Sequence, residues 1–385
     1  MPSRLPTPFP RRERTTRPSP LAPGSLASAA GILLALVAAA ASAGPPYQLY
    51  YGDLHGHTAY TDGTGTPWDA YAAARAAGAD FFAVTDHDGY GFYLSEEEWE
   101  DTKAAADAST SRDFVGIAGY EFWLAGSGEI NVFGVADLPP LPEDPEAHPA
   151  PGGRGSPAEV LPAFYDWLTV QPGAVGQWNH PTYVSAEFFD FDFHDASRDA
   201  AMSLIEVWND SWFYTEDSYV KALDRGWHVM PTANADTHAA DWIAGSPNRT
   251  VLLARRLTRA DLLGAMRAGR GYATIDPNLR IGFTVNGAAM GETLAPSSRY
   301  VAAIEVEEPD GVNPIATLEI VADGGREVAS VVVNASAVTW QVTLPPDARY
   351  FFLRVTTSSD LSGGSLTDIA GDGVMAVTAP VWTGR

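Results

Sequence analysis

Histidines and carboxylates stand in closely spaced pairs along the first two-thirds of this chain. His55 and His57 are one residue apart at the end of an apolar run that begins near Gln48. Alternate residues of a strand point to the same side, so both imidazoles would face one point. Asp236 and His238 repeat this spacing farther along. Side chains placed in this way can bind one divalent cation, and we expect a metal site.

Further polar side chains follow, or interrupt, other short apolar runs. Asp62 and Gly63 begin a glycine-rich turn that can carry a carboxylate back over the first histidine pair. His87 ends a second run in Thr-Asp-His-Asp, and His180 follows another run in Asn-His-Pro. Glu121 is a single acid in the stretch Gly-Tyr-Glu-Phe-Trp, where an unpaired carboxylate would be costly unless it binds a cation.

Each fragment alone is more simply explained as a core histidine or a turn residue. Together they place five of the eight histidines at the carboxyl ends of expected strands. This is the edge where α/β barrels assemble their sites. The joint pattern therefore predicts a metal centre at one edge of a sheet or barrel.

The composition limits both the metal ligands and the binding partners that the protein can have. The 385 residues include no cysteine, which excludes disulfides, thiolate metal sites and cysteine nucleophiles, so any metal must be held by imidazole and carboxylate. With 24 lysines and arginines against 48 acids, the formal net charge is −24. Such a chain has no general attraction for nucleic acids or anionic lipid surfaces, and we expect no nucleic-acid partner.

Residues 1–43 are typical of a signal peptide. A basic segment precedes the uninterrupted apolar run 26–43, which closes with Ala-Ser-Ala, a small-x-small cleavage site. We expect cleavage after Ala43 and export to the periplasm or the extracellular space. The alternative is a retained membrane anchor, because this apolar run approaches the length of a bilayer span.

Two different hydrophobicity patterns divide the rest of the chain, residues 44–385, into two parts. Over 44–277, short apolar runs alternate with helix-like stretches, which predicts a mostly parallel α/β sheet or barrel. Over 278–385, alternating runs without helical period predict an Ig-like β-sandwich domain. In the first part, helices are expected at 68–77, 96–108, 157–169, 215–225 and 259–267, and strands at 48–54, 81–84, 114–119, 130–135, 173–177, 204–207, 228–231 and 250–253.

The order of the motifs resembles the PHP (polymerase and histidinol phosphatase) superfamily. His-x-His with a following Asp-Gly, Thr-Asp-His, a single acid, Asn-His-Pro and Asp-x-His succeed one another within about residues 47–290. The segment 234–238, with Arg-Ala-Gly-Arg-Gly-Tyr-Ala-Thr at 267–274, is similar to the CehA/McbA branch of metallohydrolases. The resemblance implies a distorted (β/α)7 barrel that holds two or three divalent metal ions (Mn, Zn or Fe) in one cluster.

The resemblance also implies a ligand set, in which each metal is held by imidazole and carboxylate groups. The first metal would be bound by His55, His57, Glu121 and Asp236, the second by Glu121 and His180, and the third by Asp62, His87 and His238. This chain departs from many relatives at Glu129, where they carry histidine. As a ligand, this harder carboxylate would favour Mn²⁺ or Fe²⁺ over Zn²⁺ at its site. Its alternative role is that of a surface acid.

Such a cluster can lower the pKa of a metal-bridging water to about 7, so that hydroxide attacks a phosphorus or carbonyl centre. We expect an exported metal-dependent hydrolase that cleaves phosphodiester or phosphomonoester bonds, or carboxyl-ester or carbamate bonds, of a small substrate. Arg249 is the expected donor to the developing oxyanion, acting with His180 and Asp236 as catalytic residues. The alternative for Arg249 is a salt bridge with one of the many acids.

A different class of function fits the same sequence. The chain would then be a surface or matrix binding protein with structural metals and a β-sandwich attachment module. Asp86 and Asp88, which flank His87, are expected to support that ligand or to shape a turn. His228 is expected to lie inside a strand and to pack. An aromatic rim that suits a neutral or aromatic substrate is expected from residues at the same strand ends: Trp123, Trp178, Trp208, Trp212, Phe213 and Trp242.

Overall fold

The computed structural model describes residues 47–89, 92–124, 126–139, 157–181, 188–210, 213–358 and 373–385. The expected signal peptide lies outside these residues, as does nearly all of the Pro- and Gly-rich segment 138–156. Within the described ranges, no helix is both long and apolar enough to cross a lipid bilayer.

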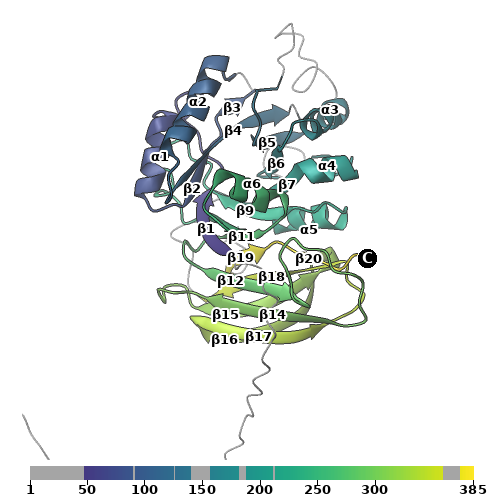
Figure 1. Ribbon diagram of the computed structural model, residues 1–385. Coiled ribbons are helices and arrows are strands. Elements are labelled where there is room, and N and C mark those ends of the chain that lie inside the picture. The colour runs from purple at the N-terminus through teal and green to yellow at the C-terminus, as the bar shows by residue number, and fades with distance from the viewer. Residues whose placement is uncertain are drawn as a thin grey trace, which may run out of the picture. The chain divides into compact units, whose positions relative to one another are not determined.

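The first part of the chain alternates strands and helices, with the strands near the middle of Figure 1. Its strands are β1 (Gln48–Asp53), β2 (Phe81–Val84), β3 (His87–Asp88), β4 (Val115–Leu124), β5 (Gly128–Phe133), β6 (Val175–Asn179), β7 (Met202–Asn209), β8 (Phe213–Tyr214), β9 (Met230–Asn234), β10 (Arg249–Ala254) and β11 (Gly271–Thr274). Its helices are α1 (Pro67–Ala76), α2 (Glu96–Ser109), α3 (Pro157–Thr169), α4 (Ala196–Ala201), α5 (Glu216–Asp224) and α6 (Arg259–Arg267).

Hydrogen bonds connect these strands in the order β10-β1-β2-β4-β5-β6-β7, and β9 pairs with β7 on its other side. Strand β9 then meets β10 through the hydroxyl of Thr250, which accepts the Ala233 N–H at 3.1 Å and donates to Oδ1 of Asn234 at 2.9 Å. The strands that carry the chemistry-bearing motifs therefore follow one another in a closed order.

The expectation of a mostly parallel sheet is only partly right. The pairs β1–β2, β2–β4, β6–β7 and β7–β9 are parallel, whereas β4–β5, β5–β6 and β1–β10 are antiparallel. The pair β4–β5 has a simple cause. β4 ends at Leu124 and β5 begins at Gly128, and so short a connection permits a hairpin but no crossover.

Helix boundaries follow local capping chemistry. The hydroxyl of Thr66 caps α1, and Asp69 bonds back to the Thr66 N–H; Ser95 and Glu98 form the same reciprocal box at α2. In Figure 1, α1 and α2 lie on one side of β1, β2 and β4, while α3, α4 and α5 lie on the other. Covered strands of this kind have no polar face, and all four residues of β2 are buried.

The second part is all-β, in two antiparallel sheets. One contains β12 (Arg280–Val285), β13 (Ala288–Ala289), β14 (Tyr300–Glu307) and β17 (Ala337–Leu344). The other contains β15 (Ile315–Ala322), β16 (Arg326–Ala335), β18 (Tyr350–Thr357), β19 (Val374–Thr378) and β20 (Val381–Trp382). Burial alternates along β14, and the ring of Tyr300 lies 5.7 Å from that of Phe351 in β18. Apolar faces of the two sheets therefore pack together.

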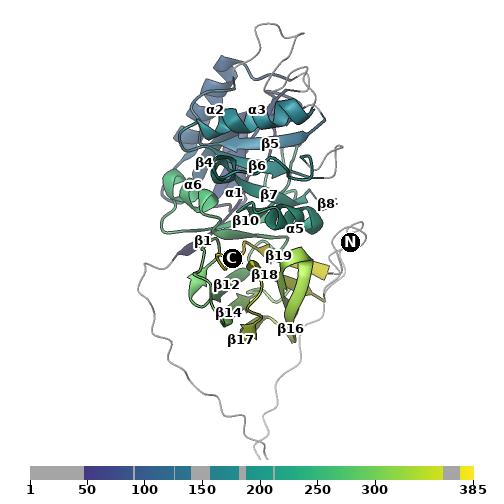
Figure 2. The same ribbon diagram turned by 90° about the vertical axis from the view of Figure 1, so that its right-hand side faces the viewer.

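Strand β11 belongs to both parts. It pairs antiparallel with β10 on one side and with β19 on the other. Figure 2 labels these two neighbours, β10 and β19, near the centre of the view. Helix α5 is also bound to the second part, because Arg349 contacts Asp224 and Arg354 contacts Glu216. Residues 45–385 form one compact unit. The domain boundary near residue 278 remains a prediction.

Candidate metal centre

Two loops that are distant in sequence are joined at the edge of the sheet. The N–H of Asp236 donates to the carbonyl of His55 at 3.0 Å, and the N–H of His57 donates to the carbonyl of Thr237 at 2.9 Å. Gly56 and Thr237 thus form an isolated parallel bridge. This bridge continues the strand pattern past the ends of β1 and β9, and it sets the two i, i+2 pairs side by side.

The turn that carries Asp62 is held by Asp86. The Asp86 carboxylate accepts hydrogen bonds from the Thr58 N–H at 2.7 Å, the Thr58 hydroxyl at 2.6 Å and the Thr61 hydroxyl at 2.9 Å. Asp86 therefore shapes the turn, one of the two roles expected for it. Gly63 follows because a Cβ there would lie 2.7 Å from the carbonyl carbon of His57, closer than any side chain allows.

Glu121 occupies the middle of the cluster. Its Oε1 lies 3.2 Å from Nε2 of His55, and its Oε2 lies 3.4 Å from Nε2 of His57 and 3.1 Å from Nδ1 of His87. Asp236 Oδ1 lies 3.2 Å from Nε2 of His55 and 2.9 Å from Nε2 of His57. Ligand atoms of His55, His57, Glu121 and Asp236 all lie within 4.8 Å of one another. This is the set expected for the first metal.

A second group opens toward solvent. Ligand atoms of His57, Asp62, His87 and His238 also lie within 4.8 Å of one another. Asp62 is central here, with one oxygen 3.4 Å from Nε2 of His238 and the other 3.5 Å from Nε2 of His87. It contains the three residues expected for the third metal and adds His57. His238 is the most exposed member, at 40% of its side chain, so solvent reaches the cluster from this side.

Glu129 lies in the centre rather than on the surface. Its Oε2 is 3.2 Å from Nε2 of His180, and His87, Glu121 and Glu129 form a third group of ligand atoms within 4.8 Å of one another. His180 Nε2 is also 3.4 Å from Glu121 Oε1. The hairpin β4–β5 explains this placement, because it pairs Trp123 with Glu129 and brings β5 beside Glu121.

Three buried imidazole nitrogens indicate that these residues fit divalent metal ions. His55 Nε2, His57 Nδ1 and His87 Nδ1 are buried without a hydrogen-bond partner. Each belongs to a ring that faces carboxylate oxygens at the distances given above. A buried imidazole nitrogen without a hydrogen-bond partner is costly unless it binds a metal ion or another ligand. Nitrogen and oxygen ligands of this kind suit Zn, Mn or Fe.

Electrostatics point to the same conclusion. Burial alone would raise the pKa of Glu121, but the charges of His55 and His87 outweigh it and hold that pKa well below its usual range. Burial alone would lower the pKa of His180, but its hydrogen bond to Glu121 and the carboxylate charges raise it to about 9. The acids thus draw positive charge into the cluster, and protons and metal ions compete for it.

Two candidate ligands lie in strained backbone. His180 has φ of 28° and Asp236 has φ of 49°, in the left-handed region that non-glycine residues rarely adopt. Conformations of this kind cost on the order of 1–3 kcal/mol and persist where surrounding contacts enforce them. They direct both side chains into the centre, where Asp236 Oδ2 and His180 Nε2 are 3.9 Å apart.

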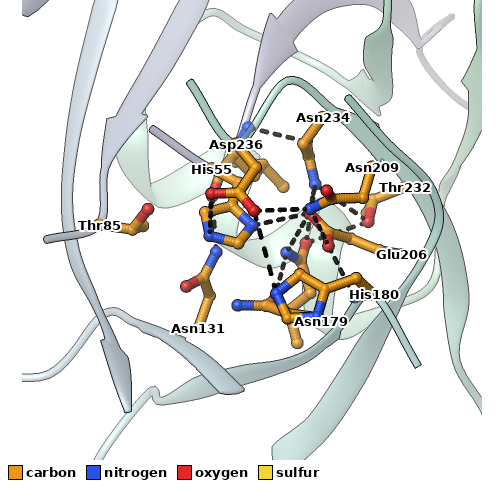
Figure 3. A network of polar contacts seen from close by, with 12 residues as sticks. His55, Thr85, Asn131, Asn179, His180, Glu206, Asn209, Thr232, Asn234 and Asp236 are labelled. Carbon is orange, nitrogen blue, oxygen red and sulfur yellow. Dashed lines mark hydrogen bonds and ion pairs between the residues drawn. The ribbon is translucent and has the colours of Figure 1, made fainter. Parts of the chain in front are cut away.

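Glu206 holds the candidate ligands His55 and His180 in place. It was not among the residues predicted from the sequence. Figure 3 shows its carboxylate among His55, His180, Asn209 and Asn234. Its Oε1 lies 2.9 Å from Nδ1 of His55 and accepts from Asn234 Nδ2 at 2.8 Å; its Oε2 accepts from the His180 N–H at 2.9 Å and from Asn209 Nδ2 at 3.0 Å. One fully buried carboxylate thus orients ligands from two different loops.

Other supporting residues were also missed. Asn179 donates from Nδ2 to Glu121 Oε1 at 2.6 Å and so fixes the shared carboxylate. Asp53, at the end of β1, accepts the N–H groups of His55 and Ala235, and burial raises the pKa of its carboxyl to about 7. Asp88 has neither expected role, because both its oxygens are buried without a partner; burial raises its pKa to about 7 as well.

Arg249 is not directed at the cluster by any described contact. Its guanidinium donates to the backbone carbonyls of Ser246, Asn248 and Ile243, and so braces the loop before β10. Its role as oxyanion donor remains a prediction. The placement of His228 inside a strand is wrong: β9 begins at Met230, and the exposed His228 ring bonds to Asp199 and contacts Trp382 at an interplanar angle of 42°.

The expected aromatic rim is largely core. Trp178, Trp208 and Trp242 are buried. Trp178 packs edge-on against Trp227 and donates to the Tyr165 hydroxyl, and Trp242 donates to the His57 carbonyl. Trp123 is half-buried, whereas Trp212 and the side chain of Phe213 lie outside the described residues. Aromatic residues here serve packing because large rings at strand ends fill the space beneath the helices.

Comparisons with known proteins give the following. No protein-family model matches the chain, and no curated protein matches it either. It is similar to a solved two-domain protein from Bacteroides vulgatus described as containing a predicted PHP-like metal-dependent phosphoesterase, at 14% identity and a TM-score of 0.45, covering 87% of this chain and 96% of that one.

Two more solved structures are similar over about half of the chain. One is described as a proposed metal-dependent phosphoesterase from Bifidobacterium adolescentis, at 16% identity and a TM-score of 0.28, covering 48% of this chain and 87% of that one. The other is an amidohydrolase from Chromobacterium violaceum with bound sulfate and no metal, at 19% identity and a TM-score of 0.30, covering 49% and 87%.

Proposed function

We propose that the chain is a metal-dependent hydrolase of the PHP type that cleaves phosphoester bonds of a small substrate, with carboxyl-ester or carbamate bonds as the competing substrate class. The observation that carries this proposal is the sharing of Glu121 between two groups of ligand atoms and of His57 between the first group and the solvent-facing one. Structural sites are usually closed four-ligand cages, whereas overlapping groups with an open side are typical of hydrolytic centres.

The candidate ligands can be assigned to three ions. His55, His57, Glu121 and Asp236 would hold one ion, Glu121, Glu129 and His180 a second, and Asp62, His87 and His238 a third. When bound, such ions supply Lewis-acid polarisation of the substrate and a water that is deprotonated near neutral pH. Glu206 and Asn179 hold His55 and Glu121 in place, so that the cluster is arranged before substrate arrives.

The surroundings of the open side suit a proton carrier. His238 Nδ1 lies 3.0 Å from the carbonyl of Asp236, and its Nε2 lies 3.4 Å from Asp62. It is the most exposed member of the cluster, so its imidazole can reach solvent when it does not hold an ion. General acid help to the leaving group is a role for which imidazole is suited.

The type of barrel and the export of the protein belong to the same proposal. The closed strand order with helices on the outside supports the distorted (β/α)7 barrel of the PHP type, and Asn234–His238 supports the CehA/McbA branch. The basic and apolar residues before Gly44 support export with cleavage after Ala43. Carboxylates dominate the group around Glu129, and this supports Mn²⁺ or Fe²⁺ over Zn²⁺ at that position.

The test combines metal analysis with a substrate panel. Purified protein is stripped with EDTA, reloaded with Mn²⁺, Fe²⁺ or Zn²⁺, and assayed with a nitrophenyl phosphodiester, a nitrophenyl phosphate and a nitrophenyl ester. We expect two or three ions per chain and activity on at least one phosphoester. His87→Ala and Asp236→Ala are expected to lose activity, and Glu305→Gln, an exposed acid of β14, serves as the matched control. Bound metal without hydrolysis of any substrate would support the binding protein instead.

A further inference from the structure

Two neighbouring strands of the all-β part each have a free edge. β16 is the last strand of its sheet, and β17 is the last strand of the other sheet. The two strands lie next to each other at the lower end of Figure 1. In the part of the chain that the structure describes, no strand pairs with the outer edge of either one. Backbone N–H and C=O groups on these edges can therefore pair with a further strand.

The other ends of the same two sheets are protected by their shortness. One sheet ends there with β8 and the other with β13, and each of these strands has two residues. A very short edge strand offers little for another chain to pair with. In contrast, β16 has ten residues and β17 has eight. The long edges are therefore confined to one side of the sandwich.

The long edges also lack the usual chemical protection. Residues 328–344, which we call the uncharged edge, contain no charged residue and no proline. Charged side chains and prolines are the common means by which natural proteins keep an edge strand from pairing. Their absence is unusual in this chain, because 19% of its residues are charged. The uncharged edge is thus suited to pairing rather than guarded against it.

Apolar side chains of the uncharged edge are incompletely covered. Val332 is 70% exposed. Five more apolar side chains pack against the core of the sandwich but stay only partly buried: Val331, Val333, Val338, Trp340 and Val342. They lie at the side of the sandwich where each sheet ends, so no neighbouring strand covers them. A partner that covered this side would remove apolar surface from water, which favours association.

The side of the sandwich formed by β16 and β17 is large enough for a stable interface. A ten-residue strand is about 33 Å long, and two sheets about 10 Å apart are roughly 20 Å deep with their outer side chains. Contact over the whole side would bury on the order of 600 Å² per protomer, which is about where stable protein interfaces begin.

The charge of the protein favours a second copy as the occupant. With a formal net charge of −24, two copies repel each other over most of their surfaces. The uncharged edge is a place where they can meet without this repulsion. A basic partner, by contrast, would find no carboxylate on this edge and would bind better elsewhere on so acidic a surface.

We propose that the uncharged edge is the interface of a homodimer, in which β16 of one protomer pairs antiparallel with β16 of a second copy. A two-fold axis sets a strand against its own copy in the antiparallel direction, so the same edge serves both protomers. The two sheets that contain β16 then continue into each other, and the half-covered valines and Trp340 are enclosed. This interface does not depend on the proposed hydrolase function.

The first test measures mass by light scattering over a range of protein concentrations. We expect the wild type to have twice the mass of one chain. Val332→Lys and Val332→Glu should each raise the dimer dissociation constant on the order of 100-fold, because both copies then bring the same charge to one interface. Val312→Lys changes another exposed valine, in the loop between β14 and β15, and is expected to leave the dimer intact.

A second measurement locates the interface. N–H groups on the outer edge of β16 exchange slowly with solvent only when a strand pairs with them. Mass spectrometry of hydrogen exchange should therefore show slower exchange over residues 326–335 in the dimer than in Val332→Lys, with β14 unchanged. Val332 is exposed, so its replacement leaves the packing of the core intact, and circular dichroism verifies the fold of each variant.

Three results would overturn the proposal. The first is a wild type that stays monomeric at every concentration, which leaves the edge free or covered by another protein. The second is a dimer that persists unchanged in both Val332 variants. The third is a dimer in which residues 326–335 exchange as fast as in the monomeric variant, because association then uses another surface.

Discussion

Glu206 Oε1 lies 2.9 Å from Nδ1 of His55, on the opposite side of the imidazole ring from the Nε2 that faces Glu121 and Asp236. A carboxylate in this position holds the ring proton on Nδ1 and leaves the lone pair of Nε2 free for a metal ion. Glu206 also accepts the His180 N–H, so it aligns ligands that would belong to two different ions.

Glu206→Gln should weaken metal binding while the protein stays folded. The amide keeps the size of the side chain, but its NH2 group meets N–H donors from His180 or Asn209 instead of accepting from them. Loss of such a supporting carboxylate typically costs 10- to 100-fold in metal affinity or activity. Competition with a chromogenic chelator measures this affinity, with Glu305→Gln as the control. An unchanged affinity would mean that Glu206 serves packing alone.

Glu121→Gln should remove more than one ion. Glu121 has oxygens in two ligand groups, whereas His238 contributes to one. Metal content by mass spectrometry is therefore expected to fall further in Glu121→Gln than in His238→Ala. Activity should fall on the order of 10²-fold or more, as when a single transition-state donor is removed. Equal metal loss in the two variants would contradict a shared carboxylate.

Arg354→Met should destabilise the protein without touching the metal centre. Arg354 Nε donates to Glu216 at 2.9 Å and Nη1 donates to Glu319 at 2.9 Å, so the guanidinium links α5 to β15 and β18. Its removal leaves the buried Glu216 carboxylate without a counter-charge, which costs about 3 kcal/mol. Urea unfolding measures the loss. Arg280→Met breaks an exposed pair and is expected to change nothing measurable.

Asp80→Asn should alter the pH dependence of stability with a defined sign. Burial raises the pKa of Asp80 above its unfolded value, even though the Tyr51 N–H donates to its Oδ2 at 2.8 Å. The stability that this carboxyl contributes is therefore full below the unfolded pKa of about 4 and is lost as the pH rises through the folded pKa. Relative to the variant, the wild type should lose stability as the pH rises above about 4 and through the raised folded-state pKa.

Asp113→Asn provides the opposite sign. A hydrogen bond from the Ser111 hydroxyl lowers the pKa of Asp113, so its contribution is present above the unfolded pKa and is lost as the pH falls. Urea unfolding in EDTA at several pH values separates the two variants. If the free energy of unfolding of both variants changes with pH in the same way as that of the wild type, neither pKa shift is present.

Local patterns predict much of the fold. The boundaries of α3, α6 and β2 agree with those expected from periodicity, since capping residues, proline and apolar spacing mark them in the sequence. The extension of β4 to Leu124 and the hairpin that follows it could not be predicted in this way. The polar Glu121 in that stretch serves the metal centre, and such functional residues break the alternation that marks a strand.

Four candidate ligands, His55, His57, Asp236 and His238, could be proposed from the sequence because they occur in spaced pairs, whereas the residues that support the candidate ligands are not paired. Glu206 nevertheless carries the signal that identified Glu121, a lone acid in an apolar stretch, here Leu-Ile-Glu-Val-Trp. The same argument applied to residue 206 would have found it. Asn179 and Asp53 give no such signal, because an amide or an acid at a strand end is more often a turn residue. Their roles depend on neighbours that only the tertiary fold supplies.

Strand β11 has a consequence for how the protein is made. It lies between β10 and β19, so one edge of the first part of the chain stays uncovered until residues 374–378 have left the ribosome. An uncovered strand edge invites pairing with other chains, and a chaperone that binds exposed strands would be expected to recognise it during synthesis. The same delay would keep the polypeptide from closing early, which the proposed export through a narrow translocation channel requires.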